Sequence, residues 1–257
     1  MKQNRNEPHP VGRVFSKLRA VVLVLALALF VAGCAGWFGG KKAEKTAEEL
    51  AREATSYFEA EKYSKALKSY ERLRDWYPYS VHAKEAKLRI ADAHFQLKEY
   101  EQALQAYEQY EQLHPSDQQI PYVIYQMGMC HYKRVKSIDR TQVPTRNALE
   151  AFLRLRSRFP ESRWAQKSEE KIARCRKHLA GHEYYVGRFY AKSGQQEAAM
   201  NRFETLVRQY PDVSEYTRKA RRYLEQHGRH LASDGRRHVQ DGWVQLPPIE
   251  LEWEATN

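Results

Sequence analysis

Three side chains able to bind transition metals lie at helical spacing in the second half of the chain. Cys175, His178 and His182 are three and four residues apart, so they share one face of a helix. Thiolate and imidazole ligands suit zinc, but a structural zinc site is usually completed by a fourth ligand, and the sequence offers no evident one. We therefore favour the alternative, a half-buried helix face of polar and small residues, and expect no metal and no cofactor.

No enzyme signature stands out elsewhere. The sequence has no phosphate loop, nucleophile elbow, dinucleotide fingerprint or His-Glu-x-x-His motif. The paired carboxylates Glu48-Glu49 and Glu169-Glu170 fall on polar helix faces, where they serve solubility. We expect a protein that is not an enzyme, with catalytic residues hidden in the C-terminal tail as a distant alternative.

A third cysteine, Cys34, follows a segment typical of secretory signals. Residues 1–19 are polar and basic, and residues 20–32 form an apolar run of thirteen residues. This run is short for a membrane span, which needs about 20 residues. The sequence Val31-Ala32-Gly33-Cys34 resembles a bacterial lipobox, with Val31 where Leu is usual. The resemblance predicts a signal peptide over 1–33, acylation of Cys34 and a tether over 34–43. A signal anchor with an incidental cysteine is the alternative.

The resemblance to bacterial lipoproteins also predicts where the protein resides. Ala35 follows the cysteine, and the absence of Asp at this position implies export to the outer membrane. Several acyl chains on one cysteine would hold the protein firmly, since each buried methylene contributes about 0.8 kcal/mol. We expect a protein lipid-anchored at the periplasmic face of the outer membrane.

The formal charge of +11 and the two remaining cysteines limit the other function classes. Basic residues are scattered rather than gathered in a stripe, so we expect no nucleic-acid binding, although anionic lipid or an acidic partner is favoured. Cys130 and Cys175 could pair in an oxidising periplasm. We favour two buried thiols, and the spacing leaves the pairing open.

One spacing occurs four times: an alanine, an aromatic residue four positions later, and a proline twelve positions after the alanine. The copies are Ala66–Tyr70–Pro78, Ala103–Tyr107–Pro115, Ala148–Phe152–Pro160 and Ala199–Phe203–Pro211. Each copy ends a helical pattern, and a small residue lies upstream in a preceding helix, namely Ala54, Ala91, Gly128 or Gly187. Because two helix backbones approach closely only where side chains are small, the spacing predicts stacked helical hairpins.

The hydrophobic periodicity gives the boundaries of these hairpins. We expect a solenoid over 44–230, with repeats near 47–80, 81–117, 120–161 and 162–213 and a partial repeat over 213–230. The third hairpin has a longer loop over 136–146, and the fourth begins with one long helix from 162 to 192. Residues 231–257 lack helix periodicity, so we expect an extended or disordered tail that either folds back into a groove or awaits a partner.

This pattern resembles the tetratricopeptide repeat (TPR), a helix–turn–helix unit of 34 residues. The resemblance implies an all-α, TPR-type helical-hairpin solenoid of about five repeats. The key alanines are 37, 45 and 51 residues apart, so the units contain insertions. A generic helical bundle without solenoid stacking is the alternative.

The inner face of such a solenoid is built from the first helix of each hairpin, and it binds extended peptides. In the second repeat the inward positions are Leu88, Asp92, Phe95 and Gln96. Aromatic side chains and a methionine suit a peptide anchor because they give contact area with few rotors to freeze. The predicted groove residues are Phe58, Phe95, Tyr122, Tyr125, Met129 and Tyr132. Alternatively, the rings of the third repeat pack against the second repeat.

The lipobox, the tether, the long third loop and the long fourth helix together resemble the BamD family of outer-membrane protein assembly factors. The resemblance is strongest over 122–128, 156–172 and 183–211. It implies that the N-terminal repeats receive the aromatic-ended C-terminal signal of unfolded outer-membrane β-barrel proteins. It also implies that the C-terminal repeats dock on a POTRA domain of the BamA-type barrel insertase, with Arg202 making a contact.

Other Bam lipoproteins are further candidate partners under this resemblance. The leading hypothesis is thus a non-enzymatic scaffold lipoprotein of the β-barrel assembly machinery. The runner-up is a TPR adaptor lipoprotein of another envelope complex, serving cell-wall division or pilus secretion.

Overall fold

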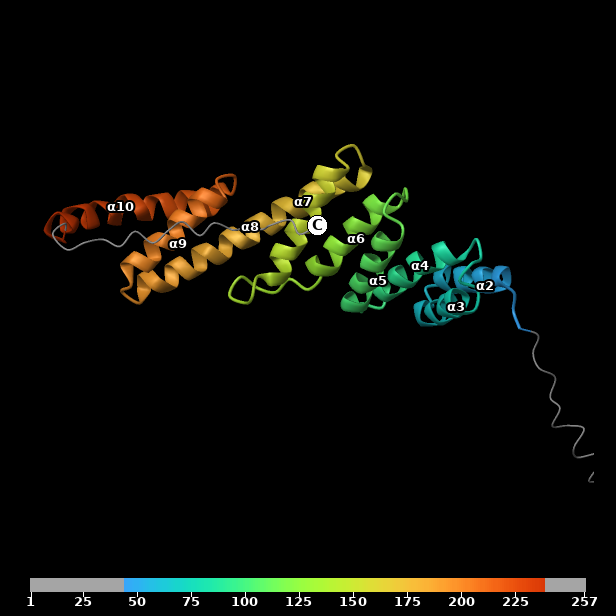
Figure 1. Ribbon diagram of the computed structural model, residues 1–257. Coiled ribbons are helices and arrows are strands. Elements are labelled where there is room, and N and C mark those ends of the chain that lie inside the picture. Colours follow the sequence, from blue (N-terminus) through green and yellow to red (C-terminus); the bar gives the residue numbers. More distant parts are fainter. Residues whose placement is uncertain (1–43, 239–257) are drawn as a thin grey trace, which may run out of the picture. The chain divides into compact units, whose positions relative to one another are not determined.

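The structure, a computed structural model, describes residues 44–238, with side chains through residue 228. The chain divides into residues 1–49 and 50–257. All secondary structure in the described part is helical. The helices are α2 (Ala47–Glu59), α3 (Tyr63–Trp76), α4 (Ala83–Gln96), α5 (Tyr100–Leu113), α6 (Ile120–Tyr132), α7 (Val143–Arg158), α8 (Arg163–Lys192), α9 (Gln196–Gln209) and α10 (Ser214–His238) (Figure 1).

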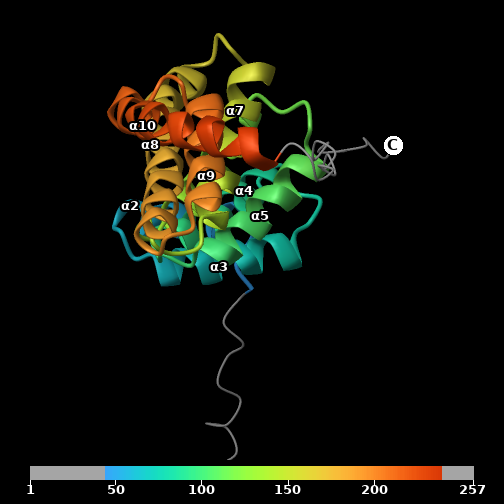
Figure 2. The same cartoon turned by 90° about the vertical axis from the view of Figure 1, so that its left-hand side faces the viewer.

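Within residues 50–238 each helix packs mainly on its neighbours in sequence, from α3 on α4 through to α9 on α10 (Figures 1 and 2). The first helices of successive hairpins also touch, since α6 contacts α8 and α8 contacts α10. A chain of hairpins in which each unit meets only the next is a solenoid. The TPR-type, all-α fold predicted from the spacing is therefore confirmed.

The small residues of the repeat lie where the aromatic residue of the same hairpin crosses the first helix. A Cβ atom added to Gly128 would lie 2.5 Å from Cε1 of Phe152. One added to Gly187 would lie 2.8 Å from Cε1 of Phe203. Both phenylalanines are fully buried. Glycine is thus required in hairpins three and four because the ring takes the space that a methyl group would fill.

Local signals set several helix ends. Pro121 and Pro144 fall in the first turns of α6 and α7, where the missing N–H has no intrahelical partner to lose. Ser162 caps α8, with its hydroxyl accepting from the backbone N–H of Ala165 at 3.1 Å. Gly194, at φ +76°, allows the tight turn into α9. As predicted, α8 is one continuous helix of 30 residues.

Two segments differ from the sequence-based prediction. The loop before α7 ends at Gln142, because Val143 and Pro144 already belong to the helix. Helix α10 continues to His238, eight residues beyond the predicted end of the solenoid at residue 230, so residues 231–238 are helical rather than extended. Apolar periodicity reports which face of a helix is packed, and a helix with little to pack against loses that signal while remaining helical. Residues 239–257 lie outside the described part.

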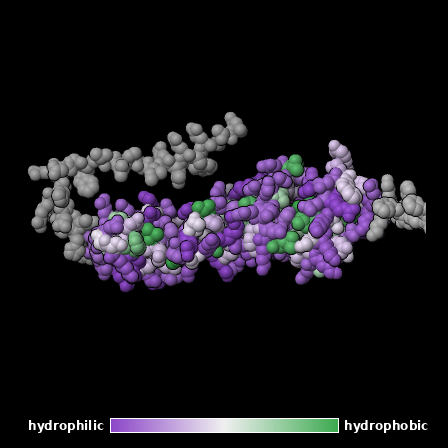
Figure 3. Space-filling model, turned by 90° about the horizontal axis from the view of Figure 1, so that it is seen from below, coloured by the Kyte–Doolittle hydropathy of each residue, from purple (hydrophilic) through white to green (hydrophobic). Residues whose placement is uncertain are grey.

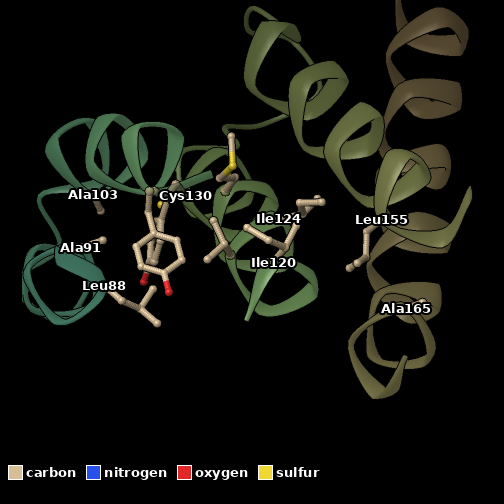
Figure 4. Packing of buried hydrophobic residues seen from close by; sticks show 12 residues of the cluster. Leu88, Ala91, Ala103, Ile120, Ile124, Cys130, Leu155 and Ala165 are labelled. Atoms are coloured by element: carbon tan, nitrogen blue, oxygen red, sulfur yellow. The ribbon is translucent and has the colours of Figure 1, made fainter. Parts of the chain in front are cut away.

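The largest core cluster lies between α4, α5, α6, α7 and α8 (Figure 4). A separate cluster around Phe203 joins α9 to α10. Cys130 and Cys175 are both free and buried, which confirms the favoured interpretation of two buried thiols. Burial raises the pKa of Cys130 to about 12 and that of Cys175 to about 11.

The surface view in Figure 3 shows a mostly hydrophilic face on which hydrophobic residues form small, separate patches. Among the residues that the structure describes, no helix combines the length and apolarity needed to cross a membrane. Cys34 and the apolar run before it lie outside these residues, so the predicted acylation stays a prediction.

Candidate functional site

A buried carboxylate joins three helices in the N-terminal half of the solenoid. Asp92 on α4 is only 4% exposed. The hydroxyls of Tyr107 on α5 and Tyr122 on α6 both donate to its Oδ1 atom at 2.7 Å. Nη1 of Arg89 donates to Oδ2 at 3.2 Å. We call these four side chains the Asp92 network. Because every member has a partner, the network fixes the orientation of Tyr122 rather than destabilising the core.

The electrostatics of the network follow from its burial. Desolvation raises the pKa of Asp92 above its ordinary value, while hydrogen bonds from Tyr122 and Tyr107 and the charge of Arg89 oppose this rise. Desolvation and the neighbouring carboxylate raise the pKa values of Tyr107 and Tyr122 well above the ordinary range. Both tyrosines are therefore neutral donors at every physiological pH.

Trp164, in the first turn of α8, completes an aromatic platform with two rings from α6. Its ring centroid lies 4.9 Å from that of Tyr122 and 5.1 Å from that of Tyr125. Two cations lie over the indole, with the Arg163 guanidinium and Lys167 Nζ each 4.7 Å from the ring centroid. Contacts of this kind stabilise by about 0.5–1 kcal/mol at exposed sites, so they hold the tryptophan in place.

A hollow of about 320 Å³ opens beside this platform. Its lining comes from the first helices of hairpins two, three and four and comprises Leu88, Arg89, Asp92, Gln119, Tyr122, Arg163 and Trp164. A second hollow of about 540 Å³ shares Leu88, Arg89 and Gln119 and continues along Lys84, Glu85, Tyr110 and residues 116–118. We call the two hollows together the N-terminal groove.

The chemistry of the N-terminal groove favours an aromatic residue next to a carboxylate. Tyr122 and Trp164 offer flat apolar area, and Arg163 brings a guanidinium to the same hollow. Arg163 has no carboxylate partner among residues 44–228, whereas Arg89 is held by Glu85 and Asp92. A guanidinium can bind a carboxylate through two parallel hydrogen bonds, which gives direction as well as affinity.

The structure places the six predicted groove residues in different surroundings. Tyr122 lines the hollow, and Tyr125 packs on Trp164 beside it. Phe58 lies under the Arg89 guanidinium at 5.7 Å and packs against Tyr63 at 5.2 Å.

Like Tyr125 and Phe58, the other three predicted residues lie outside the lining of the N-terminal groove, to which only Tyr122 of the six belongs. Phe95 pairs with Tyr100 at the turn of its own hairpin, with the ring centroids 5.5 Å apart. Met129 and Tyr132 are partly buried against the cluster around Phe152. The alternative, that the rings of repeat three pack on repeat two, holds for Tyr122. Its hydroxyl reaches Asp92 and its ring centroid lies 6.4 Å from that of Tyr107, while the same ring also contacts Trp164.

Sequence reasoning missed Trp164, Arg163 and Arg89. Trp164 occupies the first turn of the first helix of its hairpin, as Tyr122 does in the hairpin before it. The spacing to the small residues hides this likeness, since Tyr122 lies six residues before Gly128 whereas Trp164 lies 23 residues before Gly187, so only the helix start at Ser162 could have marked Trp164. The two arginines carried no such signal, because surface arginines are frequent in this chain.

The candidate metal-binding face has a structural use in the fold. Nδ1 of His182 lies 2.6 Å from the carbonyl oxygen of Ile138. His178 bonds to the backbone of Lys136, and its burial lowers its pKa. Cys175 is buried in the cluster with Phe152. The two histidines thus hold the loop before α7 against α8. No group of three metal-binding side chains lies together within the described part of the chain.

The predicted insertase contact, Arg202, lies on α9 and is paired within the chain. Its Nη1 atom is 3.3 Å from Oε2 of Glu183 on α8. The Arg202 side chain is 44% exposed and that of Glu183 is 14% exposed. The guanidinium therefore stands at the surface, oriented by a carboxylate beneath it.

The family described as "YfiO: Outer membrane lipoprotein" matches residues 43–239. The chain belongs to this family. The matched YfiO segment covers every described helix, so the resemblance to the BamD family predicted from the sequence is confirmed.

Several curated relatives of this YfiO member carry the same name. "Outer membrane protein assembly factor BamD" of Neisseria gonorrhoeae is 28% identical over 257 residues, covering 92% of this chain and 96% of the relative. The BamD of Caulobacter vibrioides is 27% identical over 208 residues, covering 79% and 68%. Among solved structures, a tetratricopeptide repeat protein from Parabacteroides merdae covers 77% of this chain and 81% of its own, with 14% identity and a TM-score of 0.38.

Proposed function

We propose that the protein is a non-enzymatic scaffold lipoprotein of outer-membrane β-barrel assembly. Membership of an outer membrane lipoprotein family and relatives named as assembly factors support this role. Cys34 supplies the lipid anchor under this proposal, and the solenoid stands on the periplasmic face of the outer membrane. The alternative, an adaptor of another envelope complex, uses the same fold with other partners.

The observation that carries the substrate part of the proposal is the N-terminal groove. The BamD resemblance implies a substrate signal that ends in an aromatic residue, and such a C-terminus would combine a ring with a free carboxylate. The ring would stack on Tyr122 and Trp164, and the carboxylate would pair with Arg163, which lines the same hollow and has no carboxylate partner in the described part of the chain. The Asp92 network holds Tyr122 before the peptide arrives, which reduces the entropy lost on binding.

The test of this groove is a peptide-binding titration with a charge-reversed variant. Arg163→Glu should weaken binding of a fluorescent barrel C-terminal peptide by about tenfold or more, as expected for loss of a charge-assisted hydrogen bond. Arg208→Glu makes the same charge change at an exposed site on α9 and should leave the affinity unchanged.

Amidation of the peptide C-terminus distinguishes a carboxylate contact from general attraction. Amidation should weaken binding to the native protein but have little further effect on Arg163→Glu. Equal losses in both proteins would contradict the pairing of Arg163 with the terminal carboxylate.

The second part of the proposal places a POTRA domain of the barrel insertase against the C-terminal hairpins near Arg202. The exposure of Arg202 and its fixed orientation by Glu183 support this role. Arg202→Glu should abolish co-purification of the insertase from detergent-solubilised outer membranes, while Arg208→Glu on the same helix should not. Recovery of a cell-wall enzyme or a secretin in place of a POTRA-containing barrel would favour the adaptor alternative.

A further inference from the structure

A second groove lies between the C-terminal half of α8 and the first half of α10. A hollow of about 540 Å³ is bounded by these helices and by Ile138 of the loop before α7. It shares Tyr184, Arg188 and Lys219 with a neighbouring hollow of about 280 Å³. We call the two hollows together the α8–α10 groove.

The α8–α10 groove exposes large apolar rings. Phe189 is 59% exposed and Tyr185 is 46% exposed, and both line the larger hollow. Most other large apolar side chains of the described solenoid are at least partly buried. Neighbouring exposed rings rimmed by polar residues are typical of a binding surface.

The charges around these rings are mostly positive. Arg188, Lys192, Lys219 and Arg222 line the two hollows. The acidic residue in the lining, Glu215, is already held by Lys177 at 2.9 Å and lies 4.0 Å from Lys219. Arg188 and Lys192 have no carboxylate partner in the described part of the chain. The groove therefore suits a segment that alternates apolar and acidic residues.

The C-terminal tail of this chain has that composition. Residues 239–257 contain four acidic residues, two tryptophans and no lysine or arginine. The stretch Ile249-Glu250-Leu251-Glu252-Trp253-Glu254 alternates strictly between apolar and acidic residues. In an extended backbone, alternate side chains point to opposite sides, so one edge would be apolar and the other acidic.

The length of the tail allows it to reach the groove. From His238, the end of α10, back to Tyr216 is 22 helical residues, or about 33 Å at 1.5 Å per residue. Trp253 lies 15 residues beyond His238, which is up to about 50 Å of extended chain. Asp241-Gly242, a turn-favouring pair, stands where the direction would have to reverse.

We propose that residues 249–254 of the same chain occupy the α8–α10 groove. Trp253 packs on Tyr185 and Phe189, and the glutamates face Arg188, Lys192 and Lys219. The tail then acts as an internal ligand that any partner using this surface must displace. This inference stands independently of the proposed function, because it rests only on the groove and the composition of the tail.

The test measures how well a probe in the groove is shielded in the full-length lipoprotein in detergent. A cysteine is introduced by Phe189→Cys, and its maleimide labelling rate is followed by mass spectrometry of the labelled peptide. Cys130 and Cys175 are buried and give little background. Leu113→Cys on α5 is the matched control, since Leu113 and Phe189 are both 59% exposed.

In the altered tail, Trp253 is replaced by Ala and Glu250, Glu252 and Glu254 are replaced by Gln. Labelling of Phe189→Cys should be about tenfold faster with the altered tail than with the native tail. A tenfold difference means that the native tail occupies the groove about nine-tenths of the time. Labelling of Leu113→Cys should not change. Equal rates of Phe189→Cys with the native and the altered tail would overturn the proposal. Shielding that disappears on dilution would also overturn it, because the tail would then come from a second copy.

A second measurement leaves Tyr185 and Phe189 unchanged. Benzoylphenylalanine in place of Trp253 should cross-link on irradiation to peptides of α8 or α10 within the same chain. Cross-links that map instead to the N-terminal groove, or to no site in the solenoid, would contradict the assignment.

Discussion

The N-terminal groove and the α8–α10 groove are both built on the first helices of successive hairpins. They differ in how their aromatic side chains are held. In the former, Tyr122 is tied by its hydroxyl to the buried carboxylate of Asp92 and by its ring to Trp164. In the latter, the side chains of Phe189 and Tyr185 are about half exposed to solvent. The first groove is organised before a ligand arrives, whereas the second offers exposed rings and unpaired cations.

Under the two proposals, one scaffold presents two kinds of binding surface. A solenoid fixes backbone positions through its small and aromatic crossings, and it leaves the other side chains of the first helices free to vary. A buried polar network makes the groove rigid, but it tolerates few substitutions because each lost hydrogen bond leaves a buried polar group without a partner. Exposed rings can be substituted with little effect on the fold, and they become buried only when a ligand occupies the groove.

The largest effect is expected from removing the centre of the Asp92 network. Asp92→Ala leaves the buried hydroxyl of Tyr107 without its acceptor, and we expect a loss of about 3 kcal/mol in the free energy of unfolding. Urea unfolding followed by circular dichroism measures it. Asp92→Asn keeps an acceptor oxygen and should lose clearly less. A loss below about 1 kcal/mol for Asp92→Ala would mean that the network does not organise the N-terminal half.

The next largest effect concerns the helix crossings that both halves share. Gly128→Ala should destabilise the protein by about 2 kcal/mol, because the new methyl group would overlap the buried Phe152 ring. Gly187→Ala should cause a smaller loss of stability. Its new Cβ atom would lie 2.8 Å from the Phe203 ring, whereas that of Gly128→Ala would lie 2.5 Å from the Phe152 ring. Thermal unfolding of both variants checks this order. Adding Phe152→Leu should relieve part of the Gly128→Ala loss, and a further loss would argue against steric overlap.

A smaller change in the free energy of unfolding is expected when the pH is lowered. Burial lowers the pKa of His131 on α6 and that of His178 on α8 below the ordinary value. As pH falls below about 6.5, the unfolded chain therefore takes up protons that the folded chain resists, and the free energy of unfolding decreases until the folded pKa values are passed. Urea unfolding at pH 7.5 and pH 5.5 measures the slope. His131→Gln and His178→Gln should each flatten it, and an unchanged slope would show that these imidazoles stay accessible to protons.

The smallest effect belongs to the exposed rings of the α8–α10 groove. Phe189→Ala should change the free energy of unfolding by less than about 0.5 kcal/mol, because most of the ring is already in solvent. Thermal unfolding of this variant in the background of an altered tail, with Trp253→Ala, provides the reference. A loss of more than about 1 kcal/mol in that background would show that Phe189 packs as a core residue, and the contrast between the two grooves would disappear.

Most helix boundaries could be predicted because their causes are local. Pro121 and Pro144 favour helix starts, Gly194 favours a helix end, and the alanine–aromatic spacing marks each second helix. The prediction was wrong at the end of α10, where the apolar periodicity fades while the backbone stays helical to His238. The candidate site was less predictable. Tyr122 and Tyr125 could be assigned to an inner face, but their partner Trp164 lies about forty residues away.

The sequence by itself determined the repeat, the hairpins and the family, because these depend on the spacing of small, aromatic and proline residues along the chain. Only the tertiary structure decided which side chains meet. Asp92 receives two hydroxyls from two other helices, and the candidate zinc ligands His178 and His182 hold a loop instead. Such contacts depend on the angle and register at which successive hairpins stack. That geometry is set by the summed packing of many residues rather than by any local motif.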